Sequence, residues 1–141
     1  MATLGTHLLV IGEEAATLVS GLQQHGVTLP TILVHRWNDA LNVLLETEEA
    51  ERFRQPGIIL LETDTSEGIR FLEQLRNTRN LRRNVVFLLT SRDDNAFKQL
   101  AYDHCVAGYL VKARLDNHFE KLAKLLNAYS SIVALPEHFS A

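Results

Sequence analysis

Polar side chains that could take part in phosphoryl chemistry follow four of the short apolar runs in this 141-residue sequence. Carboxylates can hold a divalent cation, while hydroxyl and ammonium groups can contact phosphate oxygens. In chain order, the residues concerned are Glu13, Glu14, Glu62, Asp64, Thr90, Ser91 and Lys112. Polar residues also occur wherever a strand enters solvent, so the spacing alone leaves a merely solvated rim as the other interpretation. The choice between the two depends on whether the fold brings these side chains together.

The segments that must position them alternate between apolar runs and stretches of helical period. The apolar runs are residues 7–11, 31–34, 58–61, 85–89 and 108–111. Apolar residues recur at helical spacing between them, as in Ile69, Leu72 and Leu75, and the last such stretch extends from Leu115 to Tyr129. Five strands alternating with five helices predict an α/β fold with a doubly wound parallel sheet covered on both faces. Ligands of such sheets bind beyond the carboxyl ends of the strands, where the polar residues lie.

Composition narrows the class of protein. The 14 Lys and Arg residues against 17 Asp and Glu residues give a net charge of −3 without any basic run, so we expect no nucleic-acid binding. No stretch reaches the ~20 apolar residues that span a bilayer, and there is no signal-peptide pattern, so we expect no membrane contact and a cytoplasmic protein. The single cysteine, Cys105, is expected to be a small buried residue. The length predicts one domain over residues 1–141, with a core at about 6–129 and a C-terminal tail at 130–141.

Four segments resemble the ordered strand motifs of a known family. Residues 8–13, 58–62, 86–91 and 108–112 are similar to those of the receiver domain of two-component response regulators, which has the CheY-like, flavodoxin-like fold. The resemblance covers about residues 6–129 and implies the strand order 2-1-3-4-5. It also implies phosphorelay signalling rather than an enzyme, Mg²⁺ as cofactor and a histidine kinase as partner. The loops and tail are most similar to stand-alone regulators that partner bacterial phytochromes, which implies a photoreceptor kinase.

The resemblance assigns the phosphoacceptor position to Glu62, where the family has Asp. The extra methylene adds roughly 1.5 Å of reach, and a misplacement of about 1 Å can slow an in-line transfer ~10²-fold. Gly12 and Glu13 stand at the acidic pair that holds the metal, so one of the two carboxylates is lost, although Glu14 and Asp64 are also acidic. Because Mg²⁺ usually relies on one or two carboxylates with water and phosphate, this loss weakens a metal site at Glu13 and Glu62 without excluding it.

The residues that would sense a phosphoryl group match the family in type. By resemblance, Thr90 is the hydroxyl that moves onto the phosphoryl group, Tyr109 is the aromatic switch and Lys112 binds phosphate. Lys112 is followed by Ala113 where the family has Pro, and a non-proline cis bond costs ~2.5–4 kcal/mol, so we expect a trans bond there. We hypothesise that Lys112 pairs with Glu62 and thereby holds Thr90 and Tyr109 in one conformation.

These departures favour an atypical single-domain receiver that keeps the fold and signals by protein–protein interaction. Its expected partner face comprises Arg92, Lys98, Tyr109 and His118. The alternative is a conventional Mg²⁺-dependent phosphoacceptor that uses Glu62 or Asp64. Asp64 and Ser66 could instead have a purely structural role, as capping residues of the third helix. A flavodoxin-like small-molecule site is a third hypothesis, against which stands the absence of a Ser/Thr/Gly-rich phosphate loop after the first strand.

The C-terminal tail carries several apolar residues, namely Ile132, Val133, Leu135 and Phe139. Exposed apolar groups of this kind often mark an interface, so one interpretation is a homodimer contact or a partner-docking segment. The other is that the tail folds back over its own domain or frays.

Overall fold

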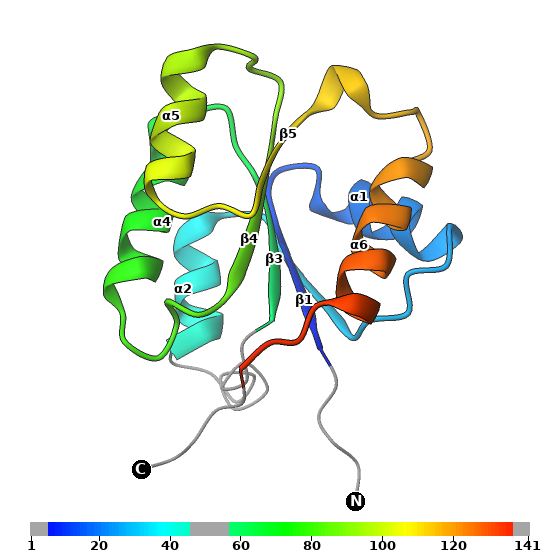
Figure 1. The fold of residues 1–141 in the computed structure, drawn as a ribbon, viewed down its shortest axis with the longest axis horizontal. Coiled ribbons are helices and arrows are strands. Elements are labelled where there is room, and N and C mark those ends of the chain that lie inside the picture. Colours follow the sequence, from blue (N-terminus) through cyan, green and yellow to red (C-terminus); the bar gives the residue numbers. More distant parts are fainter. Residues whose placement is uncertain (1–5, 46–56, 137–141) are drawn as a thin grey trace, which may run out of the picture.

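The computed structural model describes residues 6–45 and 57–136 (Figure 1). The strands are β1 (Leu8–Ile11), β2 (Thr31–Val34), β3 (Ile58–Glu62), β4 (Val85–Thr90) and β5 (Gly108–Val111). The α-helices are α1 (Ala15–Gln24), α2 (Trp37–Leu45), α4 (Ser66–Asn77), α5 (Asn95–Asp103) and α6 (Glu120–Ile132), and a short 3-10 helix, η1 (Lys112–Arg114), follows β5. The predicted alternation of strands and helices is therefore confirmed.

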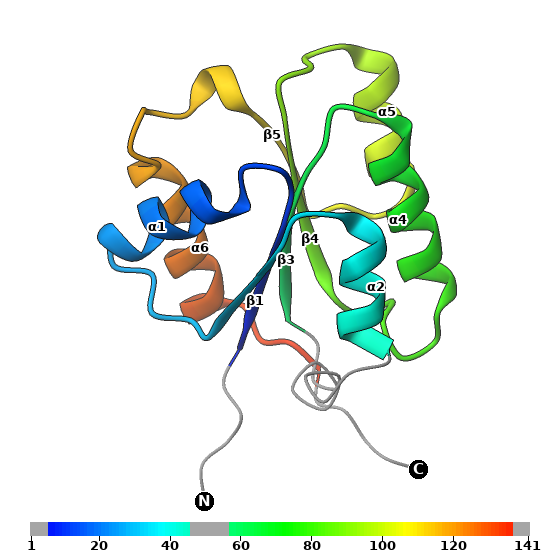
Figure 2. The same cartoon turned by 180° about the vertical axis from the view of Figure 1, so that it is seen from behind.

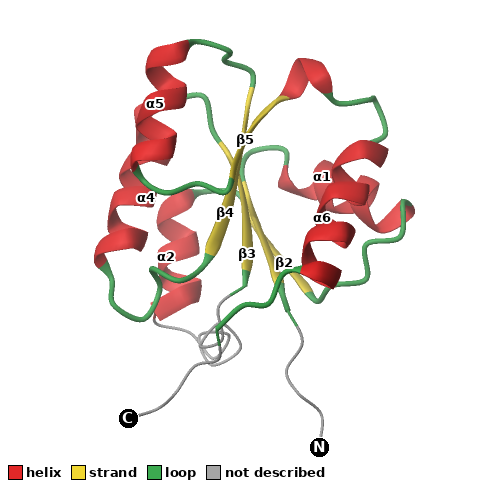
Figure 3. Ribbon diagram, in the orientation of Figure 1, coloured by secondary structure: helices red, strands yellow, loops and turns green. Residues whose placement is uncertain are grey.

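The five strands form one parallel sheet in the predicted order β2-β1-β3-β4-β5 (Figure 3). After β2 the chain returns past β1 to place β3 on its other side, so the direction of winding changes between β1 and β3. Ile11 of β1 pairs in register with Leu61 of β3. Gly12 and Glu62, the next residue of each segment, therefore lie side by side at the carboxyl edge, where ligands of this fold class bind.

Helices cover both faces of the sheet, with α1 and α6 on one side and α2, α4 and α5 on the other (Figure 1, Figure 2). Successive side chains of a strand point to opposite faces. In β1, Leu8 and Val10 accordingly join the core cluster beneath α1 and α6, whereas Leu9 and Ile11 join the cluster beneath the other three helices. A strand that is buried on both faces needs apolar residues throughout, which is why these runs show no polar alternation. None of the helices in residues 6–45 and 57–136 is long and apolar enough to cross a membrane.

The last helix begins later than its apolar pattern predicts. Leu115 and Phe119 precede α6, which starts at Glu120. Phe119 has φ of +61°, a left-handed conformation that interrupts the helical path. The carboxylate of Asp116 accepts hydrogen bonds from the backbone N–H groups of Glu120 at 3.2 Å and Lys121 at 3.3 Å. These two bonds satisfy donors of the first turn and fix the helix start downstream of Phe119.

The predicted tail is partly helical, because α6 continues through Ile132. The side chain of Ile132 is 81% exposed and that of Val133 is 38% exposed. These two residues are therefore not covered by the domain, whereas Leu135 is half-buried, so the fold-back interpretation does not hold for Ile132 and Val133. Phe139 lies outside the described residues.

Cys105 is exposed, so the prediction of a buried cysteine was wrong. The residue lies in the turn between α5 and β5 and has φ of +61°. Its position at a chain reversal explains why a residue type that is usually buried is found at the surface here.

Candidate functional site

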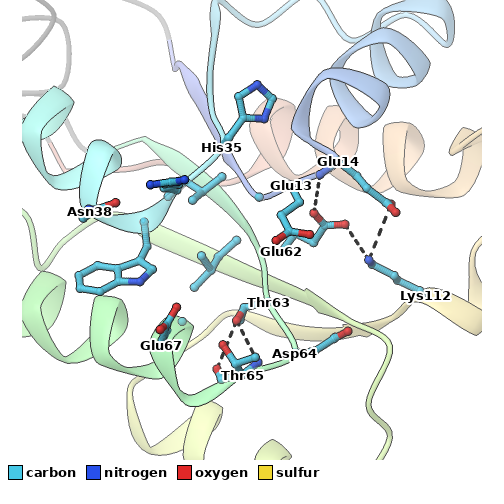
Figure 4. A pocket seen from close by; sticks show the side chains of 16 residues that line it. Glu13, Glu14, His35, Asn38, Glu62, Thr63, Asp64, Thr65, Glu67 and Lys112 are labelled. Atoms are coloured by element: carbon cyan, nitrogen blue, oxygen red, sulfur yellow. Dashed lines mark hydrogen bonds and ion pairs between the residues drawn. The ribbon is translucent and has the colours of Figure 1, made fainter.

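The polar residues that follow β1, β3 and β5 line one cleft at the carboxyl edge of the sheet (Figure 4). The cleft has a volume of about 940 Å³. The predicted site residues that line it are Glu13, Glu14, Glu62, Asp64 and Lys112. Thr90 and Tyr109 are not among its lining residues, but Thr90 is joined to the cleft by a hydrogen bond to Asp64. The fold therefore assembles most of the predicted cluster.

Both carboxylate oxygens of Glu62 are engaged within the protein. Oε1 accepts a hydrogen bond from the backbone N–H of Glu14 at 3.0 Å. Oε2 lies 2.7 Å from Nζ of Lys112, and the Glu62 side chain is only 7% exposed. The ion pair that we hypothesised from the sequence is thus present. The carboxylate is turned toward the β1–α1 turn and Lys112 rather than toward the open cleft (Figure 4).

Lys112 lies between two glutamates, 2.7 Å from Oε2 of Glu62 and 3.8 Å from Oε2 of Glu14. Burial lowers the pKa of Lys112, but the hydrogen bond and charge of Glu62, with smaller contributions from Glu14 and Asp64, hold that pKa above its ordinary value. The ammonium group therefore already has a counter-ion within the protein. The bond from Lys112 to Ala113 is trans, as predicted, since the described residues contain no cis peptide bond.

Gly12 leaves open the space that the Glu62 side chain fills. Its φ is +154°, a conformation that residues with a side chain rarely adopt, and a Cβ atom placed on it would lie 2.6 Å from Cβ of Glu62. Such a Cβ would also meet Oε1 of the same glutamate. The two departures from the receiver pattern, glycine in the acidic pair and glutamate at the acceptor position, are therefore sterically linked. The sequence contained both departures, but only the strand register shows that they touch.

Asp64 binds the end of β4 rather than capping α4. Its Oδ1 accepts hydrogen bonds from Thr90 Oγ1 at 2.6 Å and from the Ser91 backbone N–H at 2.8 Å, and its Oδ2 accepts from Ser91 Oγ at 2.6 Å. The N-cap position of α4 is occupied by Thr65, which makes no side-chain cap bond. Burial raises the pKa of Asp64, but the bonds from Ser91 and Thr90 outweigh it and hold that pKa below its usual range. The capping interpretation of Asp64 was wrong, because three donors at the end of β4 compete for the same carboxylate.

Thr90 and Tyr109 are connected through the backbone of Arg92. Thr90 is fully buried, and its hydroxyl accepts a hydrogen bond from the Arg92 N–H at 3.1 Å while it donates to Asp64. The Tyr109 hydroxyl donates to the Arg92 carbonyl at 2.7 Å. Burial, the largest of the effects on this group, raises the pKa of Tyr109 above its ordinary value of 10. The two predicted switch residues are therefore linked by one intervening residue.

Arg92 fixes the start of α5. Its guanidinium group lies 4.1 Å from the centre of the Phe97 ring and forms two hydrogen bonds to the Asp94 carboxylate, at 2.8 and 3.1 Å. Asp94 in turn caps α5, because its carboxylate accepts a hydrogen bond from the Phe97 N–H at 3.1 Å. Sequence reasoning assigned Arg92 to a partner face. The structure adds an internal role that a lone arginine after a strand does not reveal.

The expected partner face is only partly contiguous. Lys98 Nζ lies 5.6 Å from the centre of the Tyr109 ring, and the Tyr109 hydroxyl binds Arg92. His118, in contrast, lines a separate groove with residues of α1, among them Gly21. The prediction that His118 belongs to this face was wrong, because the loop before α6 runs toward α1 before the helix begins.

The cleft offers few ligands to a Mg²⁺ ion. Gly12 supplies no carboxylate, and the Glu62 carboxylate is bound to the Lys112 ammonium and the Glu14 N–H. A divalent cation at Glu62 would have to displace or lie beside the positive charge of Lys112. Within residues 6–45 and 57–136, no group of three or more His, Cys, Asp or Glu side chains is arranged to hold a metal ion. The predicted site at Glu13 and Glu62 is therefore reduced to the Glu13 carboxylate, which is the smallest number of carboxylates that Mg²⁺ usually uses together with water and phosphate.

Comparison with known proteins supports the fold at low sequence identity. No family model matches this sequence, and no curated protein matches it either. Solved structures do match over nearly the whole chain. A response regulator receiver domain from Rhodospirillum rubrum superposes with a TM-score of 0.74 at 24% identity, covering 94% of this chain and 99% of that one.

Two further neighbours are response regulators, one of which is described as a phytochrome response regulator. The phosphorylated cyanobacterial phytochrome response regulator RcpA gives a TM-score of 0.76 at 20% identity, covering 94% of this chain and all of the other. The Mn²⁺-bound response regulator Rcp1 gives a TM-score of 0.73 at 20% identity, covering 92% of this chain and 99% of that one. The chain thus has the CheY-like fold of response regulator receiver domains, including those of phytochrome response regulators.

Proposed function

We propose that this protein is a receiver-type signalling module that acts through protein–protein contacts and does not accept a phosphoryl group at Glu62. The observation that carries the proposal is the double engagement of the Glu62 carboxylate, by Lys112 at 2.7 Å and by the Glu14 N–H at 3.0 Å. A phosphoacceptor must present a free carboxylate oxygen in line with the phosphoryl donor. Here both oxygens are held and the side chain is 7% exposed.

The groups that would stabilise a phosphoryl group are also already bound to carboxylates of the protein. The Lys112 ammonium is paired with Glu62, and the Thr90 hydroxyl is bound to Asp64. In phosphoryl transfer, catalysis comes mainly from positioning and from groups that neutralise the charge of the transferred phosphate. A phosphate entering this cleft would have to displace two carboxylates from their partners. This arrangement supports a module whose state does not depend on phosphorylation.

The structural neighbours support the class of partner. Several of them are named as phytochrome response regulators, among them RcpA and the bacteriophytochrome response regulator RtBRR. We therefore propose a histidine kinase, a photoreceptor kinase or another protein of the same signalling system as the partner. The surface around Arg92, Lys98 and Tyr109 is the proposed contact, and the exposed Ile132 at the end of α6 supports self-association as a second mode of assembly.

The test is exposure of the intact protein to acetyl phosphate and Mg²⁺, followed by intact-mass and peptide-mass measurement. A receiver with aspartate at the acceptor position serves as the positive control under the same conditions. We expect no phosphoryl adduct on this protein. A stoichiometric, acid-stable and hydroxylamine-labile adduct at Glu62 or Asp64 would overturn the proposal and establish the conventional phosphoacceptor in its place.

A further inference from the structure

The carboxylate of Asp64 receives three hydrogen bonds from two consecutive residues at the end of β4. Thr90 Oγ1 and the Ser91 N–H both donate to Oδ1, at 2.6 and 2.8 Å, and Ser91 Oγ donates to Oδ2 at 2.6 Å. Two hydroxyls and a backbone N–H that converge on one point form a small anion-binding set. The anion in this set is part of the protein itself.

The donors of this set need an acceptor in order to keep their positions. Thr90 is fully buried, so its hydroxyl has no access to water and would be destabilising there without a hydrogen-bond acceptor. By resemblance, Thr90 is the residue that would move onto a phosphoryl group. Asp64 supplies a negatively charged oxygen to the same hydroxyl, and it does so from β3–α4 without any covalent modification.

The set is continuous with the surface near α5. The Arg92 N–H donates to Thr90 Oγ1 at 3.1 Å, and the Arg92 guanidinium reaches back to the Asp64 carbonyl at 3.3 Å. The Arg92 carbonyl accepts from the Tyr109 hydroxyl at 2.7 Å. Residues 90–92 are therefore held by hydrogen bonds to Asp64 on one side, and their backbone binds the Tyr109 hydroxyl on the other side.

We propose that Asp64 is a positioning residue that acts as a built-in anion, occupying an oxyanion site formed by Thr90 and Ser91 and holding the Arg92–Tyr109 contact in place. The inference rests on the function proposed above. In it, Asp64 supplies the Thr90 hydroxyl with the negatively charged oxygen that a phosphoryl group on the acceptor residue would otherwise supply. It also defines a latent site. Removal of the Asp64 side chain opens a surface position with three donors that suits a small carboxylate or oxyanion from solution.

The experiment is chemical rescue of the Asp64→Ala variant, followed by the backbone amide NMR signals of Ser91 and Arg92 and the ring signals of Tyr109. We expect these signals to shift in the variant and to return toward their wild-type positions as sodium formate is added, in a saturable manner. Sodium chloride at equal ionic strength should not restore them. The wild-type protein should show no formate-dependent change at the same residues, because its own carboxylate fills the site.

Glu67→Ala is the matched control, since Glu67 is an acidic residue that lines the same cleft. Its loss should leave the signals of residues 91 and 92 in place and create no response to formate. If formate restores the Asp64→Ala signals no better than chloride does, or if those signals do not shift in the first place, the proposal is wrong.

A second variant keeps the test decisive if Asp64→Ala does not fold. Asp64→Asn preserves the size of the side chain but removes the charge and one acceptor oxygen, so the Ser91 and Arg92 amide signals should still shift, and unchanged signals would refute the inference. Neither acetyl phosphate nor Mg²⁺ is present in these experiments. The proposal for Asp64 can therefore be refuted while Glu62 remains unphosphorylated. Phosphorylation of Glu62 can likewise be detected whatever the rescue experiment shows.

Discussion

The Glu62 carboxylate and the Lys112 ammonium group lie 2.7 Å apart across the carboxyl edge of the sheet, one at the end of β3 and the other immediately after β5. The glutamate is almost fully buried, whereas Lys112 is about one-third exposed. A pair of this kind contributes little net stability by itself, because desolvation of both charges offsets their attraction. Removal of one partner is costly, however, since it leaves the other charge partly desolvated and alone.

We predict that Glu62→Gln lowers the free energy of unfolding by about 1–3 kcal/mol, less than the loss from a fully buried pair because water still reaches Lys112. Urea denaturation at neutral pH measures the effect. Glu14→Gln is the control, because Glu14 lies 3.8 Å from the same ammonium group and its side chain is 63% exposed. Its substitution should change stability by under about 1 kcal/mol. Equal losses of stability in the two variants would show that the ion pair of Lys112 with Glu62 contributes no more than its contact with Glu14.

The hydrogen bonds to Asp64 predict a pH dependence. Because the folded protein holds the pKa of Asp64 below the ordinary value of 3.8, the ionised side chain stabilises the fold above that value, and this contribution is lost as the pH falls through the lower folded pKa. At neutral pH, Asp64→Asn should be less stable than the wild type by about 1–2 kcal/mol, a figure kept small by the exposure of Asp64 to solvent. The difference should shrink as the pH falls below 3.8 and through the lower folded pKa. Unfolding curves of both proteins at neutral pH and across the acid range test this, and a difference that grows in acid would contradict it.

Part of this site could be predicted from sequence because it depends only on strand order. Glu62 and Lys112 each follow an apolar run, and in a parallel sheet those ends meet at one edge, so their pairing could be inferred before the geometry was known. The strand order itself came from the resemblance to receiver domains rather than from periodicity. Apolar spacing misplaced the start of α6, because Phe119 has the apolar character of a helical position and a left-handed backbone.

The role of Asp64 could not be predicted in the same way. An aspartate just before a helix is a good N-cap, so the local sequence favours a capping role. It contains no information on the three donors that Thr90 and Ser91 bring to this carboxylate from the end of β4. The contact between Gly12 and Glu62 was equally hidden, since it depends on the parallel pairing of β1 with β3 and not on either residue type alone. In both cases the deciding interaction joins residues that are far apart in the sequence.

The donor set of the cleft predicts weak Mg²⁺ binding. A ligand that binds only the folded state stabilises it by RT ln(1 + [L]/Kd), so millimolar Mg²⁺ should raise the melting temperature measurably only if Kd is also millimolar or lower. Because the Lys112 ammonium is bound to the Glu62 carboxylate, we expect no shift beyond that produced by NaCl at equal ionic strength. Thermal melts with added MgCl2 or NaCl make the comparison. A larger rise with Mg²⁺ that disappears in Glu13→Gln would show that a metal site exists at this carboxylate.

The steric link between Gly12 and Glu62 predicts an unusually costly alanine substitution. In Gly12→Ala, the new Cβ would meet Cβ and Oε1 of Glu62 in addition to the strain of φ at +154°. Gly26→Ala is the matched control, because Gly26 also has positive φ, at +90°, but a Cβ there would meet nothing within 4 Å. We expect Gly26→Ala to cost about 1 kcal/mol from backbone strain, and Gly12→Ala to cost about 1–3 kcal/mol more, because overlap with a packed side chain adds to that strain. Urea denaturation of the two variants gives the difference directly. If both lose the same stability, the Glu62 side chain moves aside freely and the carboxylate is not held as tightly by Lys112 and the Glu14 N–H as their short distances indicate.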